Sequence, residues 1–313
     1  MSNPKYVFLD DAIVPWDQGT VHVNSAAFKF GSSVFEGLRG YWNAADGEMY
    51  LFRMADHMQR LVFSQRFMRY AEIYTPEFVT EKTLELVHAN GFKGENLHIM
   101  TTAYIKGGGG QSVTGPIGLS ITVQERPRTT KITSGVSAQV SSWMRVPDNA
   151  MPMRAKVNAN YQNGRLATLQ AVGDGYDTAI LLNSRGKVAE GPGMCFFIVR
   201  DGQPITPHTS SDILESITRD TVLQLLAEMG RPAIERDVDR SELVAAEEAF
   251  FCGTAWEVTP VTMIDKLPVG DGTIGSLTQG LQERYFDVCA GTSGAHPEWR
   301  MPVYAAAKAD AAE

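Results

Sequence analysis

The chain has 313 residues, of which 43% are hydrophobic and 20% charged, and its formal net charge is −8. This length is enough for about two domains, and the composition is typical of a well-packed globular protein. An acidic chain lacks the basic face that nucleic acids require, and no run of about 18 apolar residues is present to cross a membrane. We therefore expect neither a nucleic-acid partner nor a membrane partner.

The cysteines are too few and too scattered for a covalent or metal framework. Cys195, Cys252 and Cys289 have neither the even number of a disulfide set nor the CxxC spacing of a zinc site. The N-terminal stretch lacks the basic-then-apolar order of a signal peptide. We expect no metal site and a location in the reducing cytoplasm.

The first part of the chain mixes predicted strands and helices. Residues 5–16 indicate two short strands around a turn. Apolar spacing predicts a helix from Ala55 to about Tyr70, and a second helix follows that ends at Asn90-Gly91. Residues 96–105 and 119–124 have the pattern of strands.

A polar stretch at residues 124–134, which contains Pro127, is the predicted interdomain loop. It separates an N-terminal α/β domain, residues 1–123, from a C-terminal α/β domain, residues 135–313. Beyond the loop, the sequence predicts these elements: a strand at 136–143, a helix at 162–171, three strands within 177–205, a helix at 217–229, more strands within 247–261, and a helical or frayed tail from 304.

Several stretches carry side chains suited to chemistry. Lys156 lies among small and amide residues in "MRAKVNANY", and Glu190 closes a predicted strand before a Gly-Pro-Gly turn. Residues 216–218 open a helix whose N–H groups suit a phosphate, and residues 253–255 form a second turn. Arg60 lies within an apolar-striped helix. Each also has an ordinary explanation: an exposed strand-end glutamate, a serine N-cap, a tight turn, or an arginine beside the core.

Taken together, these features match one cofactor. Pyridoxal 5′-phosphate needs an amine for a Schiff base, an anion at its pyridine nitrogen and a cradle for its phosphate. From about Tyr6 to about Phe286 the chain resembles the fold-type IV pyridoxal-phosphate enzymes, most closely the branched-chain aminotransferases. The resemblance is carried by "FGSSVFEGLR", "HMQRL", "KVNANY", "EGPGMCFFIV", "LESITRD" and "GTAWEVTPV" in this order.

The resemblance implies a mixed α+β fold of the D-amino-acid-aminotransferase type, with the active site between two domains. It makes Lys156 the catalytic Schiff-base lysine and places Glu190 at the pyridine nitrogen. The other cofactor contacts that it implies are Arg60, Tyr161, Leu214, Ser216, Ile217, Thr218 and Thr254. The substrate contacts that it implies or leaves as candidates are Phe30, Phe35, Gly37, Arg39, His98, Met100, Arg126, Arg128, Ala255 and Trp256.

The sequence departs from the branched-chain pattern around the substrate. The usual Tyr-x-Arg-Pro segment is replaced by His98-Ile99-Met100-Thr101, so the arginine that helps to receive an acidic co-substrate is missing. Phe30 replaces a tyrosine and Trp256 a small residue, and the usual Leu-Pro-Gly-Ile-Thr segment reads Leu-Glu-Ser-Ile-Thr here. Arg126 and Arg128 on the loop are candidates to receive the carboxylate, although they also suit a pair of solvated loop charges.

The resemblance favours an aminotransferase that works by a ping-pong mechanism, with a hydrophobic, branched-chain type amino donor and a 2-oxo acid acceptor. A second possibility is an (R)-selective amine:pyruvate or D-amino-acid transaminase. A third is a lyase of the aminodeoxychorismate lyase type, and a fourth is a non-enzymatic binding protein, which would not need both Lys156 and Glu190. The resemblance also implies a homodimer.

Overall fold

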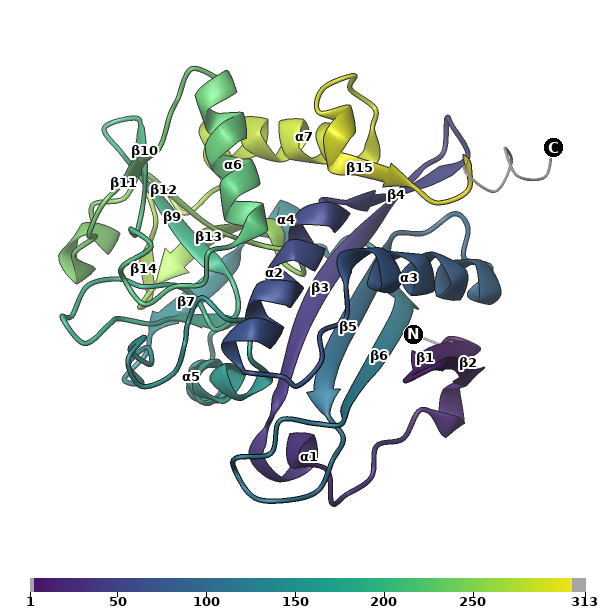
Figure 1. The fold of residues 1–313 in the computed structure, drawn as a ribbon. Helices are drawn as coiled ribbons and strands as arrows, with labels where there is room; N and C mark the ends of the chain where they lie inside the picture. The colour runs from purple at the N-terminus through teal and green to yellow at the C-terminus, as the bar shows by residue number, and fades with distance from the viewer. Residues whose placement is uncertain (1–2, 306–313) are drawn as a thin grey trace. The chain divides into compact units, whose positions relative to one another are not determined.

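The computed structural model describes residues 3–305, which form two compact units (Figure 1). Unit 1 takes the chain up to Arg128, the short segment Ala155–Ala159 and the chain from Asp287, while unit 2 takes Thr129–Arg154 and Asn160–Phe286. The predicted bounds of 1–123 and 135–313 therefore differ from the structure in two places. The segment with Lys156 belongs to unit 1 because its apolar residues pack in the unit 1 core. Residues 306–313, most of the predicted tail, lie outside the described residues.

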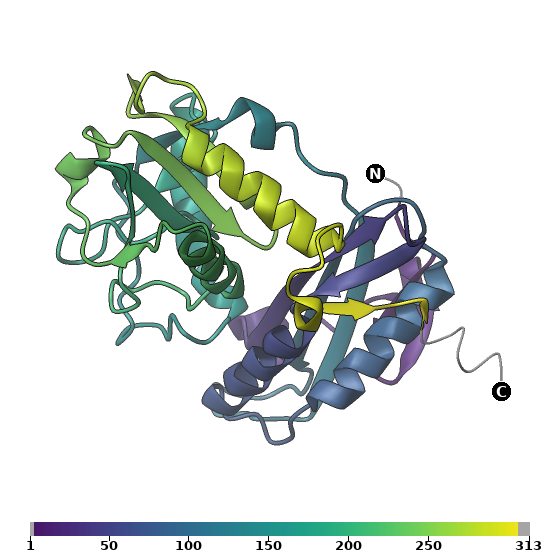
Figure 2. The ribbon, with the colours of Figure 1, turned by 90° about the horizontal axis from the view of Figure 1, so that it is seen from above.

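Unit 1 is built on a seven-stranded antiparallel sheet. Its strands, in spatial order, are β15 (Arg300–Pro302), β4 (Glu48–Phe52), β3 (Ser33–Asn43), β5 (Leu97–Ile105), β6 (Ile117–Glu125), β1 (Tyr6–Leu9) and β2 (Ala12–Pro15). Helices α2 (Met54–Phe67) and α3 (Pro76–Asn90) cover one face of this sheet, as Figures 1 and 2 both show. The predicted strands at 5–16, 96–105 and 119–124 are confirmed.

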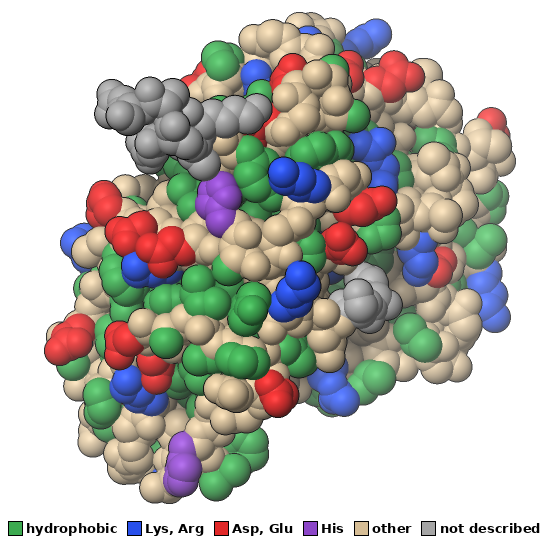
Figure 3. Space-filling view, turned by 90° about the vertical axis from the view of Figure 1, so that its right-hand side faces the viewer, with side chains coloured by type: hydrophobic (Ala, Val, Ile, Leu, Met, Phe, Trp, Pro, Cys, Tyr) green, Lys and Arg blue, Asp and Glu red, His purple; other side chains and the backbone are tan. Residues whose placement is uncertain are grey.

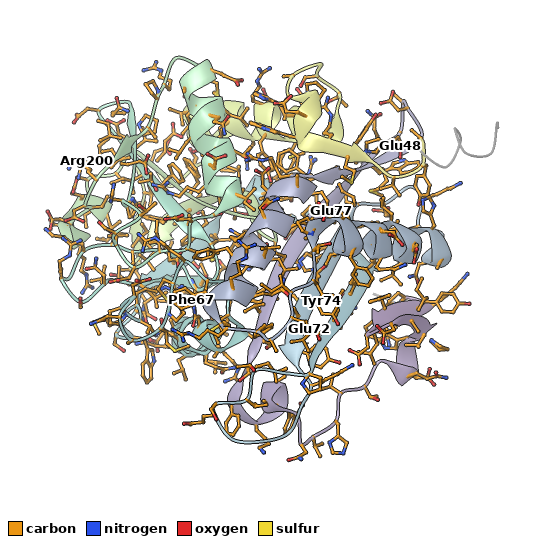
Figure 4. The ribbon with its side chains drawn as sticks, in the orientation of Figure 1. Glu48, Phe67, Glu72, Tyr74, Glu77 and Arg200 are labelled. Atoms are coloured by element: carbon orange, nitrogen blue, oxygen red, sulfur yellow. The ribbon has the colours of Figure 1, made fainter. Side chains whose placement is uncertain are left out.

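The two helices of unit 1 begin and end close to the predicted residues. In α3, the Thr75 hydroxyl accepts a hydrogen bond from Phe78 N, and Gly91 ends the helix with a left-handed φ of 69°. The prediction for α2 extended to about Tyr70, but the helix ends at Phe67, and Arg69 has a φ of 55°. Figure 4 labels Phe67 at this end. The short helix α1 (Ala26–Phe30) was not predicted.

Unit 2 contains an eight-stranded mixed sheet. Its strands are β11 (Ile234–Glu235), β10 (Gln203–Thr206), β9 (Cys195–Arg200), β12 (Glu248–Gly253), β13 (Glu257–Ile264), β7 (Val136–Val140) and β8 (Thr178–Ile180), with β14 (Leu267–Pro268) paired to β13. Arg200, labelled in Figure 4, ends β9 and pairs with Glu242 at 2.6 Å. The remaining helices of residues 3–305 are distributed over both units. They are α4 (Lys131–Ser134), α5 (Tyr161–Gly173), α6 (Ile217–Glu228), α7 (Ser276–Ala290) and the 3₁₀ turns Trp16–Gln18, Asn158–Asn160, Arg240–Leu243 and Pro297–Trp299.

Besides α1, two more helices, α4 and α7, were not predicted from the sequence. The short helix α4 falls inside the predicted loop at 124–134. The long helix α7 buries Leu281, Tyr285, Val288 and Cys289, which recur at the spacing of one helix face. The periodicity of these four residues was therefore a usable signal for α7.

A buried carboxylate attaches the end of the described chain to unit 1. Glu48, labelled in Figure 4, is only 6% exposed. Its Oε1 accepts hydrogen bonds from the backbone N–H groups of Met49, Val303 and Tyr304 at 2.7–3.0 Å. Charge-assisted bonds of this kind are stronger than neutral ones, so they hold the strand β15 beside β4.

The surface drawn in Figure 3 carries acidic, basic and apolar side chains side by side, with no single sign of charge dominating. This mixture agrees with a chain whose acidic residues only moderately outnumber its basic ones. In the part of the chain that the structure describes, no helix has both the length and the apolar composition needed to span a bilayer.

Candidate active site

Lys156 lies on the segment that pairs with the beginning of β3 in unit 1. Its carbonyl accepts a hydrogen bond from Phe35 N at 3.0 Å, and its own N–H donates to Ser64 Oγ at 3.0 Å. The side chain is partly buried, and Nζ lies 4.6 Å from the centroid of the Phe35 ring. The backbone of Lys156 is therefore fixed on both sides, and its amine is held against one of the residues that were predicted to bind substrate.

Five of the predicted substrate residues share one face of the unit 1 sheet. Side chains alternate along a strand, so Phe35, Gly37 and Arg39 of β3 point to the same side. In the pairing with β5, Gly37 is opposite Met100 and Arg39 is opposite His98, and directly opposed residues share a face. The register therefore builds a strip with an apolar part, formed by Phe35, Gly37 and Met100, and a basic part, formed by Arg39 and His98.

The basic part of this strip is electropositive. Burial and, to a smaller extent, the nearby charges of Arg126, Arg39 and Lys156 together lower the pKa of His98 to about 4. The imidazole is therefore neutral at pH 7 and is surrounded by cations. Arg126 thus belongs to the electrostatic environment of the strip, whereas Arg128 is exposed further along the loop.

The predicted phosphate arginine lies on the other face of the same sheet. Arg60, on α2, donates from Nε and Nη2 to the carboxylate of Glu36, and His57 Nδ1 contacts the same carboxylate. Glu36 alternates with Phe35 and Gly37 along β3, so it points toward the helices. Neither Glu36, within "FGSSVFEGLR", nor His57, within "HMQRL", was predicted, because only the fold brings them together.

Phe30 is the last residue of α1 and is 41% exposed. The next residue, Gly31, has a left-handed φ of 66°, and a Cβ there would lie 3.3 Å from Cβ of Ala159. The stretch after Phe30 therefore runs against the segment that carries Lys156.

In unit 2, Glu190 forms an ion pair with Arg145, whose Nη2 lies 2.5 Å from Oε1. Both residues are buried, at 3% and 4% exposure. The Cys195 thiol lies 3.8 Å from Oε2 of Glu190 and 3.8 Å from the carbonyl oxygen of Leu214. Leu214 and Glu190 therefore contact the same thiol. Arg145 was not predicted.

The prediction that Glu190 closes a strand is wrong. Neighbouring Lys187 and Val188 form only isolated bridges, to Asp239 and Leu182, and Glu190 itself lies in irregular structure. Its carbonyl nevertheless accepts a hydrogen bond from Leu181 N at 2.9 Å. The Gly-Pro-Gly sequence follows directly, and the ion pair with Arg145 holds the side chain of Glu190 in place.

The predicted phosphate residues lie at the beginning of α6. Ser216 is the N-cap, and its Oγ accepts a hydrogen bond from Arg219 N at 3.2 Å. Ile217 and Thr218 form the first turn, whose N–H groups have no acceptor inside the helix. Such N–H groups, together with the positive end of the helix dipole, favour an anion.

The turn between β12 and β13 carries Thr254 and Ala255, both partly buried. It is closed by a hydrogen bond from Trp256 N to the carbonyl of Gly253 at 3.0 Å. A Cβ on Gly253 would lie 3.3 Å from Cβ of Met194, so glycine permits the close approach of the two turns. The Trp256 ring packs edge-on against Phe251, 6.0 Å away.

Tyr161 is the first residue of α5 and is partly buried. A Cβ on Gly193 would lie 3.4 Å from Cε1 of its ring. Tyr161 therefore lies against the Gly-Pro-Gly turn that follows Glu190.

These side chains fit pyridoxal 5′-phosphate. Lys156 supplies a positioned amine, and Glu190 supplies a buried carboxylate whose charge is balanced by Arg145. Arg60 and the first turn of α6 supply donors of the kind that bind phosphate. The donor set therefore contains a partner for the aldehyde, the ring nitrogen and the phosphate of this cofactor.

Comparisons with known proteins agree with this chemistry. The family model for amino-transferase class IV matches residues 33–264. The probable branched-chain-amino-acid aminotransferase of Aquifex aeolicus is 37% identical over 305 residues, which cover 96% of this chain and 97% of that protein. The branched-chain-amino-acid aminotransferase of Pseudomonas aeruginosa is 34% identical over 304 residues, which cover 95% of this chain and 97% of that protein.

Solved structures give the same result. The branched-chain aminotransferase of Thermoproteus uzoniensis, crystallised with norvaline, superposes with a TM-score of 0.90 at 39% identity and covers 96% of this chain and all of that one. The holo form of the Thermobaculum terrenum branched-chain enzyme, which contains pyridoxal phosphate, superposes with a TM-score of 0.89 at 42% identity. The match covers 97% of this chain and 99% of that one.

The structure and the comparisons thus define a fold-type IV enzyme that uses pyridoxal phosphate. The chain belongs to the class IV aminotransferases, and it is a transaminase whose substrates are an amino donor and a 2-oxo acid.

Proposed function

We propose that the protein transfers the amino group of a hydrophobic, branched-chain type amino acid to a 2-oxo acid. The observation that carries this proposal is the likeness, over nearly the whole chain, to enzymes named branched-chain aminotransferases. The strip beside Lys156 supports it, because Phe35, Gly37 and Met100 offer an apolar surface for an aliphatic side chain.

We assign Lys156 the catalytic role. When bound, the cofactor supplies an electron-accepting ring. Lys156 Nζ then takes the proton from the substrate Cα and returns it at the cofactor C4′ atom. Glu190 holds a proton on the pyridine nitrogen, and Arg145 keeps its carboxylate oriented and charge-balanced inside unit 2.

The remaining roles concern binding. We assign Arg60, Ser216, Ile217, Thr218 and Thr254 to the phosphate. Tyr161 and Leu214 border the ring, and Ala255 and Trp256 border the substrate. Three positions support these roles. Ser216, Ile217 and Thr218 lie at the start of α6, and Thr254 lies in the turn after β12. The carbonyl oxygen of Leu214 contacts the same Cys195 thiol that contacts Glu190.

Met100 stands where the branched-chain enzymes carry an arginine, so a different cation has to bind the carboxylate of the acceptor. Arg126 is the first candidate, since its charge acts on His98 in the same strip, and Arg39 lies directly opposite His98. Arg128 is the weaker candidate, because it is exposed. The neutral His98 imidazole can donate one hydrogen bond to the same carboxylate.

The test of the proposed donor is a half-reaction panel. The holoenzyme is mixed separately with L-leucine, D-alanine and (R)-1-phenylethylamine, and the absorbance of the lysine-bound cofactor is followed. Bleaching that is fastest with L-leucine supports the proposal. Bleaching only with D-alanine or with the (R)-amine would instead assign one of the other transaminase activities, which the named relatives do not favour.

We further infer a homodimer in a reducing cytoplasm. Large apolar side chains are exposed near α1, including Val23 at 66% and Phe28 at 71%, and a second copy would cover them. The three cysteines are buried and form no disulfide within the described residues, which suits a reducing compartment. Sedimentation of the active holoenzyme tests the dimer, and full activity at a monomer's mass would refute it.

A further inference from the structure

A buried cluster of charge joins β3 to α2 in unit 1. Glu36 is 0% exposed and His57 2%, and the Arg60 side chain is 12% exposed. Glu36 Oε1 accepts a hydrogen bond from Arg60 Nε, and Oε2 accepts one from Arg60 Nη2, both at 2.7 Å. The third contact, from His57 Nδ1 to Oε2, is also 2.7 Å. Both carboxylate oxygens are therefore engaged, one of them twice.

The protonation of the cluster follows from its surroundings. Burial raises the pKa of Glu36, but the charge of Arg60 and the hydrogen bonds from Arg60 and His57 outweigh it and lower the pKa to about 2. Burial lowers the pKa of His57 below its ordinary value. Glu36 is therefore an anion and His57 a neutral ring at pH 7. Because a carboxylate can only accept, the His57 proton is on Nδ1.

This geometry determines how Arg60 is presented. A guanidinium held through Nε and Nη2 cannot rotate about its last bonds without breaking two charge-assisted hydrogen bonds. The Nη1 side then faces away from Glu36 in a fixed direction. His57 lies three residues before Arg60 on α2 and holds the second oxygen of Glu36, so it keeps the carboxylate in the plane of the fork.

We propose that Glu36 and His57 are positioning residues that fix the plane of Arg60 so that it binds the cofactor phosphate. This inference rests on the proposed phosphate role of Arg60. Fixed orientation matters most when Lys156 has been released to move the proton, because the phosphate contacts then hold the cofactor without help from the lysine. An ion pair that only stabilised the fold would not affect cofactor binding through the contact between Arg60 and the phosphate.

The experiment titrates pyridoxamine 5′-phosphate, which forms no bond to Lys156, into the full-length protein and six variants. The variants are Glu36→Gln, Arg60→Met, the double variant Glu36→Gln/Arg60→Met, His57→Asn, His57→Leu and Asp56→Asn. The last is a matched control, because Asp56 on α2 accepts a 2.6 Å hydrogen bond from Arg53, the N-cap residue of that helix, and has no proposed role at the site.

We expect Glu36→Gln to raise the dissociation constant about tenfold or more, since hydrogen bonds to charged groups are lost. In the Arg60→Met background the same substitution should change the constant by less than about twofold. Asp56→Asn should leave it unchanged. His57→Asn, which keeps a donor near the position of Nδ1, should bind more tightly than His57→Leu.

Three outcomes are decisive. Equal losses from Glu36→Gln in both backgrounds, or no loss in the native background, overturn the positioning role. No loss from Arg60→Met overturns the phosphate role of Arg60 itself and so the assumption beneath the inference. If Glu36→Gln folds poorly, the His57 variants decide instead, because equal dissociation constants for His57→Asn and His57→Leu overturn the positioning role.

Discussion

Glu190 and Arg145 form an ion pair inside unit 2, with 2.5 Å between Oε1 and Nη2. The two residues are 45 positions apart in the chain, yet both side chains are almost wholly buried. A buried carboxylate without such a partner would be strongly disfavoured. The pair therefore allows a negative charge to persist on Glu190, the residue that we propose for the pyridine nitrogen of the cofactor.

This relationship predicts the effect of Glu190→Gln. An amide has no charge to hold the ring nitrogen protonated, so we expect kcat to fall by about 100-fold or more while the cofactor remains bound. Steady-state kinetics and the cofactor absorbance measure the two effects separately. Glu228→Gln is the matched control, because Glu228 pairs with Arg284 at the surface of the same unit. A nearly normal kcat for Glu190→Gln would make this residue an ordinary buried charge.

The second prediction concerns Lys156. Its Nζ lies against the Phe35 ring, and its backbone is fixed by hydrogen bonds on both sides. Borohydride reduction of the holoenzyme followed by peptide mass mapping should place the cofactor on Lys156 alone, and Lys156→Ala should abolish the label. Label on a different lysine, such as the exposed Lys29, would contradict the assignment.

Local patterns predicted much of this fold. The stop of α3 at Gly91 follows from a glycine that accepts a left-handed φ, and the strands β5 and β6 follow from alternation. Lys156 and Glu190 stood out because their neighbours in the sequence are unusual. These signals are contained in a few consecutive residues.

The partners of the site residues were not predictable in this way. Glu36 and His57 are 21 positions apart, and only the packing of α2 on β3 makes them neighbours. Arg145 is similarly remote from Glu190. The Ala155–Ala159 segment joins unit 1 through pairing with β3, which no local pattern indicates. The sequence therefore predicted candidate reactive groups but not the residues that orient them.

The third prediction concerns the ionisation of His98. Its pKa of about 4 lies below the value in the unfolded chain, so the unfolded state binds the proton first as the pH falls. The contribution of the neutral His98 ring to the free energy of unfolding is therefore fully present above about pH 6.5, and it is lost as the pH decreases through about 4. NMR titration of the ring, assigned with His98→Gln, should give a midpoint near 4. A midpoint near 6.5 would mean that neither burial nor the neighbouring cations shift the pKa of His98.

The binding of a 2-oxo acid should raise that midpoint. A carboxylate placed among His98, Arg39 and Arg126 cancels part of the positive potential that keeps the ring neutral. The same titration with a non-reactive monocarboxylic acid, such as 4-methylvaleric acid, supplies the comparison. An unchanged midpoint at saturating ligand would place the carboxylate elsewhere.

The last prediction separates the two loop arginines. Arg126 acts electrostatically on His98, whereas Arg128 is exposed, and Met100 cannot replace an arginine. A guanidinium–carboxylate pair contributes roughly 1.5–3 kcal/mol, so Arg126→Ala should raise KM for 2-oxoglutarate or pyruvate by about ten- to a hundredfold. Arg128→Ala, the matched control, should change it by less than about threefold, because an exposed charge interacts weakly. Neither variant should greatly affect KM for a carboxylate-free amine. If both leave the oxo-acid KM unchanged, the carboxylate rests instead on backbone N–H groups around Thr254 and Ala255.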